Sequence, residues 1–131
     1  MSNGYTGTLV DGRKIYIPNW SVKVQYENLT QACKYLGQDN VIKISSLNVP
    51  AAMLAVMGSE DAKASTELLL HFTQQANLDG DKITDSSLDE VGMDIVIEIF
   101  THVMFSQYND FFVSGLAKAH SQNKSSQDKK D

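Results

Sequence analysis

The chain of 131 residues is poor in the residue types that build the commonest sites. It has one cysteine, Cys33, so it allows neither an intrachain disulfide nor a cysteine-based zinc site. Arg13 is the single arginine and the lysines are scattered, which argues against a nucleic-acid surface. The longest apolar run, residues 49–57, contains Pro50 and is far too short for a membrane span.

Catalytic and cofactor signatures are also missing from the sequence. It contains no P-loop, no G-x-S-x-G element and no G-x-G-x-x-G turn. No positive charge precedes an apolar run at the start, so we expect no signal peptide and a cytoplasmic location. The residues therefore predict no enzyme, no cofactor and no metal.

The composition is that of one globular domain, with 42% hydrophobic and 21% charged residues. The net charge of −5 is unevenly distributed along the chain. Residues 60–110 carry 11 acidic and 2 basic residues, whereas residues 1–59 and 111–131 each carry a net charge of +2. Such a layout favours contact with a basic partner or with the basic end of another copy.

The residue pattern predicts a mainly α fold with a small N-terminal β-hairpin. Asp11-Gly12 lies between two short apolar runs, which predicts a hairpin over residues 5–17. A first helix follows, with Asn19 and Ser21 as competing N-caps. Its apolar face is expected to comprise Val22, Tyr26, Leu29, Cys33 and Leu36.

The middle of the chain is less regular. Residues 41–44 suit either a short strand or an extended linker, and Pro50 suits the first turn of a helix ending before Gly58. Ser59 is the expected cap of the next helix, and residues 77–87 are expected to form a polar loop.

Residues 93–105 are apolar almost all round, which predicts a central helix with neighbours on several sides. A last helix is expected after a bend near residues 107–109. About five helices would thus form one domain over residues 1–120. Residues 121–131 contain no apolar residue, so a disordered polar tail is expected there.

Two polar constellations invite a metal hypothesis. Asn77, Asp79 and Asp81 match the first ligand positions of a calcium loop, but Lys82 and Leu88 stand where Gly and Glu are needed. This stretch is better interpreted as an acidic turn. Asp94, Glu98 and His102 recur every four residues along the central helix. They suit a metal or acid–base site, a solvated face, or a polar contact with another subunit.

The strongest remaining feature is apolar side-chain content. Residues 93–116 are rich in Ile, Val, Met and Phe, and methionines at 53, 57, 93 and 104 add adaptable side chains. Self-association, capture of an apolar partner helix and a well-filled core all explain this richness. The candidate residues, for core or partner binding, are Val96, Phe100, Met104, Phe111 and Phe112.

The order of elements resembles the tail assembly chaperones of long-tailed bacteriophages. The resemblance rests first on the strand at residues 11–17 and on the helix that begins at Trp20-Ser21 and ends at Leu36-Gly37. A middle pair of helices follows. The last feature is the helical segment of residues 94–100, which leads to Asn109-Asp110-Phe111-Phe112. It implies a non-enzymatic, oligomerising protein of the bacterial host cytoplasm. Such a protein solubilises the tape measure protein and recruits tail tube subunits. It also implies a longer frameshifted form, for which Lys129-Lys130 offers a candidate site.

Three other interpretations remain open from the sequence. The chain is alternatively a structural tail component retained in the virion, or a helical regulatory adaptor whose acidic residues 60–110 bind a basic protein. The third is a metal-dependent enzyme using Asp94, Glu98 and His102.

Overall fold

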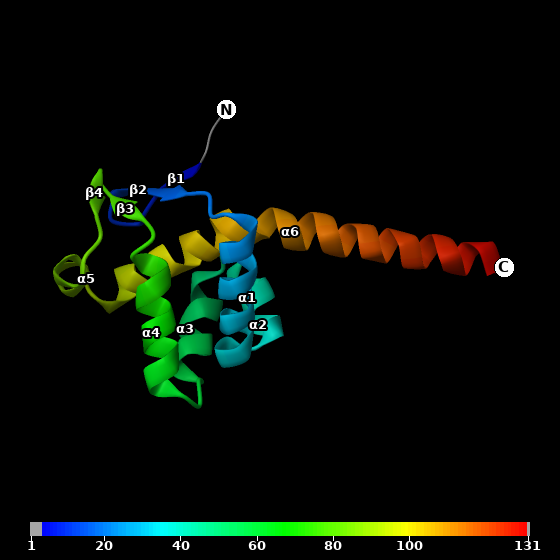
Figure 1. The fold of residues 1–131 in the computed structure, drawn as a ribbon, viewed down its shortest axis with the longest axis horizontal. Helices are drawn as coiled ribbons and strands as arrows, with labels where there is room; N and C mark the ends of the chain where they lie inside the picture. The colour runs from blue at the N-terminus through cyan, green and yellow to red at the C-terminus, as the bar shows by residue number, and fades with distance from the viewer. Residues whose placement is uncertain (1–3, 131) are drawn as a thin grey trace.

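The fold has three layers, with a long helix between a small sheet and a group of shorter helices (Figure 1). A computed structural model describes the backbone of residues 4–130 and the side chains of residues 4–115. The helices are α1 (Val22–Leu36), α2 (Gln38–Ile44), α3 (Val49–Met57), α4 (Ala62–Thr73), α5 (Asp85–Val91) and α6 (Met93–Lys130). The strands are β1 (Gly4–Thr8), β2 (Lys14–Pro18), β3 (Asn77–Leu78) and β4 (Asp81–Lys82).

The predicted N-terminal hairpin is confirmed, and a second hairpin extends it into one antiparallel sheet of order β1-β2-β3-β4. In the first turn, the Leu9 amide donates to the Arg13 carbonyl at 2.8 Å, which leaves a three-residue loop. Only Gly12 has a positive φ there, at 91°. This is the geometry of a three-residue hairpin loop, not the two-residue turn that Asp-Gly usually favours.

The second hairpin replaces the polar loop expected at residues 77–87. Asp79 and Gly80 take φ values of 50° and 88°, so both turn residues are left-handed. Asp79 also joins this hairpin to β2, because its carboxylate accepts from the Lys14 amide at 2.9 Å. Asp79-Gly80 is a second Asp-Gly pair, and it is the sequence signal for this hairpin.

Side-chain caps fix the starts of α1, α3, α4 and α5, and the cap of α4 differs from expectation. Ser21 caps α1 by accepting from the Val24 amide at 3.3 Å, as one of the two alternatives predicted. The cap of α4 is Asp61 and not Ser59, and the hydroxyl of Ser59 instead contacts the Tyr35 carbonyl. Thr84 caps α5 in a reciprocal box with Ser87.

Residues 41–44 belong to helix α2, which corrects the expectation of a strand or linker. Val41 and Ile44 are fully buried, and α2 packs against α1, α3 and α6. Burial of this i, i+3 pair outweighs the strand preference of β-branched side chains. Gly37, with a φ of 92°, separates α1 from α2.

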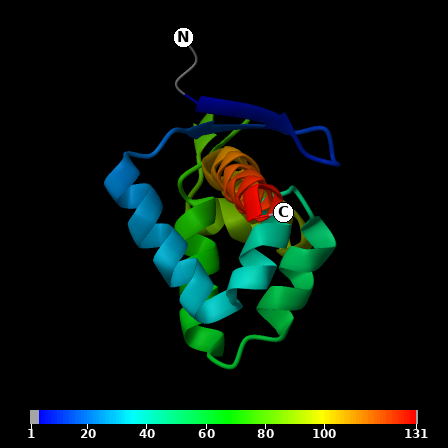
Figure 2. The ribbon, with the colours of Figure 1, turned by 90° about the vertical axis from the view of Figure 1, so that its right-hand side faces the viewer.

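Helix α6 is the centre of the fold, as predicted for residues 93–105. All side chains from Ile95 to Met104 are buried, and α6 contacts β1, β2 and the helices α2 to α5. Figure 2 looks along α6 and shows it between the sheet and the shorter helices. The expected bend near residues 107–109 is absent, since one helix runs through them.

The distal part of α6 extends well beyond the rest of the fold (Figure 1). Its backbone is helical to Lys130, where composition predicts a disordered tail over residues 121–131. A helix there makes backbone hydrogen bonds without needing apolar neighbours. The side chains beyond residue 115 lie outside the described residues, so disorder of this tail stays a prediction. Among the described helices, none has the length and apolar character that crossing a membrane requires.

Candidate interaction surface

The five candidate residues for core or partner binding divide into two groups. Phe100 and Met104 are fully buried and Val96 is 8% exposed, so these three belong to the core. Phe72 packs against Phe100 with ring centroids 5.4 Å apart, next to this part of α6. Phe111 is 49% exposed, whereas Phe112 is half-buried and packs against the core.

Phe111 lines an apolar groove of about 160 Å³ between α1 and α6. The other lining residues are Val22, Gln25, Tyr26 and Leu29 of α1 and Gln107 and Tyr108 of α6. We call this surface the α1–α6 groove. Val22 and Tyr26 are 65% and 59% exposed, although the sequence placed them on the apolar face of their helix. The face of α1 that the chain itself buries contains Asn28, Ala32 and Leu36.

A set of hydrogen bonds from Gln107 holds the start of α1 beside α6. The Gln107 side-chain oxygen accepts from the Trp20 amide and from Gln25 Nε2, both at 3.2 Å. Its amide nitrogen donates to the Pro18 carbonyl at 2.9 Å. The Tyr108 hydroxyl donates to the Gln25 carbonyl at 2.8 Å, and burial raises the pKa of this hydroxyl. The polar groups of the groove, on Gln25, Gln107 and Tyr108, are therefore neutral and hydrogen-bonded to one another or to the backbone.

Sequence reasoning missed Gln107 and the role of Trp20. Trp20 packs edge-to-face on Phe72 with ring centroids 5.3 Å apart, and it lies 6.2 Å from Tyr108. A tryptophan between a proline and a helix cap is a sequence signal for such an anchor. Gln107 offers no comparable signal, because its partners lie more than 80 residues away along the chain.

The polar strip of α6 is a buried structural contact and not an open site. The Glu98 carboxylate accepts from the Val10 amide at 2.9 Å, and the Tyr5 hydroxyl lies 2.9 Å from His102 Nδ1. His102 Nε2 and Glu98 Oε2 are 3.8 Å apart. Asp94 is exposed and has no part in these contacts. The strip thus fastens the first hairpin to α6.

Burial sets the ionisation of this cluster. Desolvation raises the pKa of the Glu98 carboxyl above its usual value, although the Val10 hydrogen bond opposes this shift. Desolvation lowers the pKa of His102, so the neutral ring is favoured near neutral pH. Within residues 4–115, no three His, Cys, Asp or Glu side chains are gathered as metal ligands.

Asp79 and Cys33, two further positions considered from the sequence, have structural roles in this fold. Asp79 belongs to the turn between β3 and β4, and its carboxylate accepts from the Lys14 amide. Cys33 is half-buried against the core, and burial raises the pKa of its thiol, which makes it a poor nucleophile.

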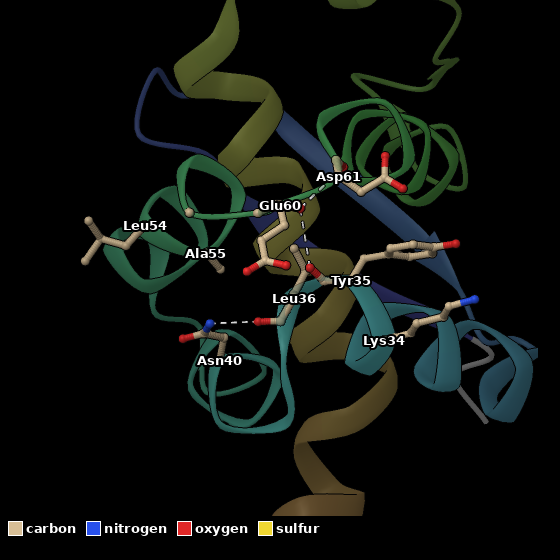
Figure 3. A pocket seen from close by; sticks show the side chains of 10 residues that line it. Lys34, Tyr35, Leu36, Asn40, Leu54, Ala55, Glu60 and Asp61 are labelled. Atoms are coloured by element: carbon tan, nitrogen blue, oxygen red, sulfur yellow. Dashed lines mark hydrogen bonds between the residues drawn. The ribbon is translucent and has the colours of Figure 1, made fainter.

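An open cavity of about 330 Å³ lies where α1 ends and the loop between α3 and α4 passes (Figure 3). Its polar groups mainly serve the fold: Asn40 Nδ2 donates to the Leu36 carbonyl at 2.7 Å, and the Ser59 hydroxyl donates to the Asp61 carbonyl at 3.3 Å. Figure 3 shows the charged end of Lys34 pointing away from Asn40 and Glu60. These groups do not converge as a binding set would.

In comparisons with known proteins, no protein-family model, no curated protein sequence and no solved structure matched this chain.

Proposed function

We propose that this chain is a non-enzymatic tail assembly chaperone of a long-tailed bacteriophage. In this proposal it acts in the host cytoplasm, binds apolar helical segments of the tape measure protein through the α1–α6 groove, and recruits tail tube subunits. The observation that carries the proposal is the cluster of exposed apolar side chains, Val22, Tyr26 and Phe111, that lines this groove. The resemblance in the order of elements supplies the identity of the partners.

The groove suits a helix because its two walls are themselves helices. Val22, Tyr26 and Leu29 recur along α1 at spacings of three and four residues, opposite Phe111 on α6. A helix seated between these walls would remove several aromatic and aliphatic side chains from water, which is the main driving force for such binding.

The test is co-expression of the full chain with a tape measure protein, the long helical partner that the proposal assigns to it. We expect a soluble complex with the parent chain and an insoluble partner with the double variant Tyr26→Ser, Phe111→Ser. Val10→Ser is the matched control, because Val10 is 87% exposed on the hairpin turn, and it should retain the complex.

Two results would overturn the proposal. One is equal solubility of the long protein with and without the chain. The other is recovery of the chain from purified virions in stoichiometric amount, which would identify a structural tail component instead.

A further inference from the structure

A second apolar surface lies where α3 meets the first turns of α6. Its hollow of about 270 Å³ is lined by Met53, Val56, Met57, Met93, Asp94 and Ile97. We call these residues the methionine patch. Met57 and Met93 are 80% and 86% exposed, among the highest values of any large apolar side chain described.

The methionine patch is the outer face of helices whose inner faces are already occupied. Ala52 and Ala55 of α3 are buried, as are Val96 and Ile99 of α6. Exposed methionines are therefore not part of the core that the chain needs to fold. Methionine is unbranched and polarisable, so it adapts to the shape of a bound apolar surface. A cluster of such side chains in water marks an interaction site.

The chain segments that supply the patch carry charge of one sign. Residues 44–62 and 83–117, which include α3, α5 and the described side chains of α6, contain no lysine or arginine. The same two segments contain Glu60, Asp61, Asp85, Asp89, Glu90, Asp94, Glu98 and Asp110. All of these are exposed except Glu98, and Asp94 itself lines the patch. An approaching partner therefore meets a negative potential.

We propose that the methionine patch binds an amphipathic helix of another protein whose apolar face is flanked by lysine or arginine. The apolar side of that helix packs on Met57 and Met93, and its cations face Asp94 and the carboxylates of α5. A second copy of this chain is a poorer occupant. A symmetric dimer through this face would place two acidic surfaces against each other. The proposal goes beyond the function proposed above, because it uses a different surface.

The experiment uses the full chain and two synthetic helical peptides of about 18 residues, which is five turns. One peptide has a leucine face flanked by lysines, and the other has the same leucine face flanked by glutamates. Titration calorimetry is expected to show binding of the lysine peptide, weakening with added salt, and binding of the glutamate peptide at least about tenfold weaker.

Substitutions locate the site. The double variant Met57→Gln, Met93→Gln changes only exposed side chains, so it should fold like the parent chain, as checked by circular dichroism. We expect it to lose affinity for the lysine peptide by about tenfold or more. The matched control is Val10→Gln, Val24→Gln, which removes two exposed apolar side chains outside both the methionine patch and the α1–α6 groove and should leave that affinity unchanged.

Three outcomes would overturn the proposal. These are no binding of the lysine peptide, equal binding of the glutamate peptide, and unchanged binding after the double methionine substitution. A concentration-dependent dimer that disappears in the methionine variant would instead assign the patch to self-association. Failure of the tape measure experiment leaves the peptide test unaffected, because the variants of the tape measure experiment lie in the α1–α6 groove and not in the methionine patch.

Discussion

Gln107 is the residue on which the geometry of the α1–α6 groove depends. One amide side chain satisfies the Trp20 backbone amide, the Gln25 side chain and the Pro18 carbonyl. Gln107 is 7% exposed, so water has little access to replace it. Removing one partner of a buried hydrogen bond leaves the other partner unsatisfied, which costs more than the bond itself contributes.

We therefore expect Gln107→Leu to lower the free energy of unfolding by about 1 kcal/mol, since it leaves the part-buried Trp20 amide and Pro18 carbonyl without their partner. Urea denaturation followed by circular dichroism measures this change. Gln31→Leu on the exposed side of α1 is the control and should change stability by less than about 0.5 kcal/mol. Equal stability of the Gln107 variant and the control would show that Gln107 does not hold α1 in place.

His102 makes the attachment of the first hairpin sensitive to pH. Its pKa is lowered in the folded chain, so the unfolded chain binds a proton at a higher pH than the folded chain does. The stability from this group is therefore present above the unfolded pKa of about 6.5 and is lost as pH falls below it. The raised pKa of Glu98 acts with the opposite sign, losing stability as pH rises above the usual carboxyl range.

The expected result for His102→Gln is a smaller loss of stability between pH 7.5 and pH 5.5 than the parent shows. Glutamine removes the titrating ring but keeps an acceptor for the Tyr5 hydroxyl. Denaturant midpoints at the two pH values measure this difference. An unchanged pH dependence in the variant would mean that another group carries the acid sensitivity.

At the scale of elements, the two Asp-Gly pairs have different structures. Asp11-Gly12 ends a three-residue loop, whereas Asp79-Gly80 forms a two-residue turn with both φ values positive. The second pair lies between strands of only two residues each. Strands that short have no recognisable alternation, so the sequence pattern predicts only a polar loop there. The carboxylate contact of Asp79 with β2 explains how so short a hairpin is held in the sheet.

Gly80→Ala tests the importance of this turn. At a φ of 88° a Cβ atom is strained, so we expect a loss of about 1 kcal/mol in the free energy of unfolding. Gly115→Ala is the matched control, because it adds the same methyl group within helix α6 and should not reduce stability. A stability loss in the control alone, with none at Gly80, would contradict the strained-turn account.

At the scale of the whole molecule, α6 has two distinct parts. Its first part is enclosed by the sheet and helices, and its distal part projects from the body (Figure 1). The α1–α6 groove lies where α6 leaves the body, and the methionine patch lies at its other end. Two separate apolar surfaces on one small domain suit a protein that brings partners together.

In the absence of a partner, the groove side chains stay in water, so we expect copies of the chain to associate through them. Light scattering at high concentration should give a mass above that of one 14.5 kDa chain. The variant Tyr26→Ser, Phe111→Ser should shift this mass toward the monomer, because it removes two large apolar contacts. A monomeric parent chain at all concentrations would contradict the expected self-association.

The sequence by itself determined the class of fold, the first hairpin and the buried centre of α6. Each of these follows from local pattern: an Asp-Gly turn between apolar runs, and an apolar helix with little polar surface. Residues such as Phe100 and Met104 are buried because almost any packing of such a helix buries them.

Only the tertiary structure decided which apolar side chains stay in water. Val22 and Tyr26 carry the same periodic signal as Leu29, Cys33 and Leu36. Only the latter three pack against the core, beside the buried Asn28 and Ala32. Periodicity shows that a helix has an apolar face, but the rotation of that helix against its neighbours depends on contacts distant in sequence, here those of Gln107 and Tyr108. For the same reason Glu98 and His102, which the sequence left open as a site, are the buried fastening of the first hairpin.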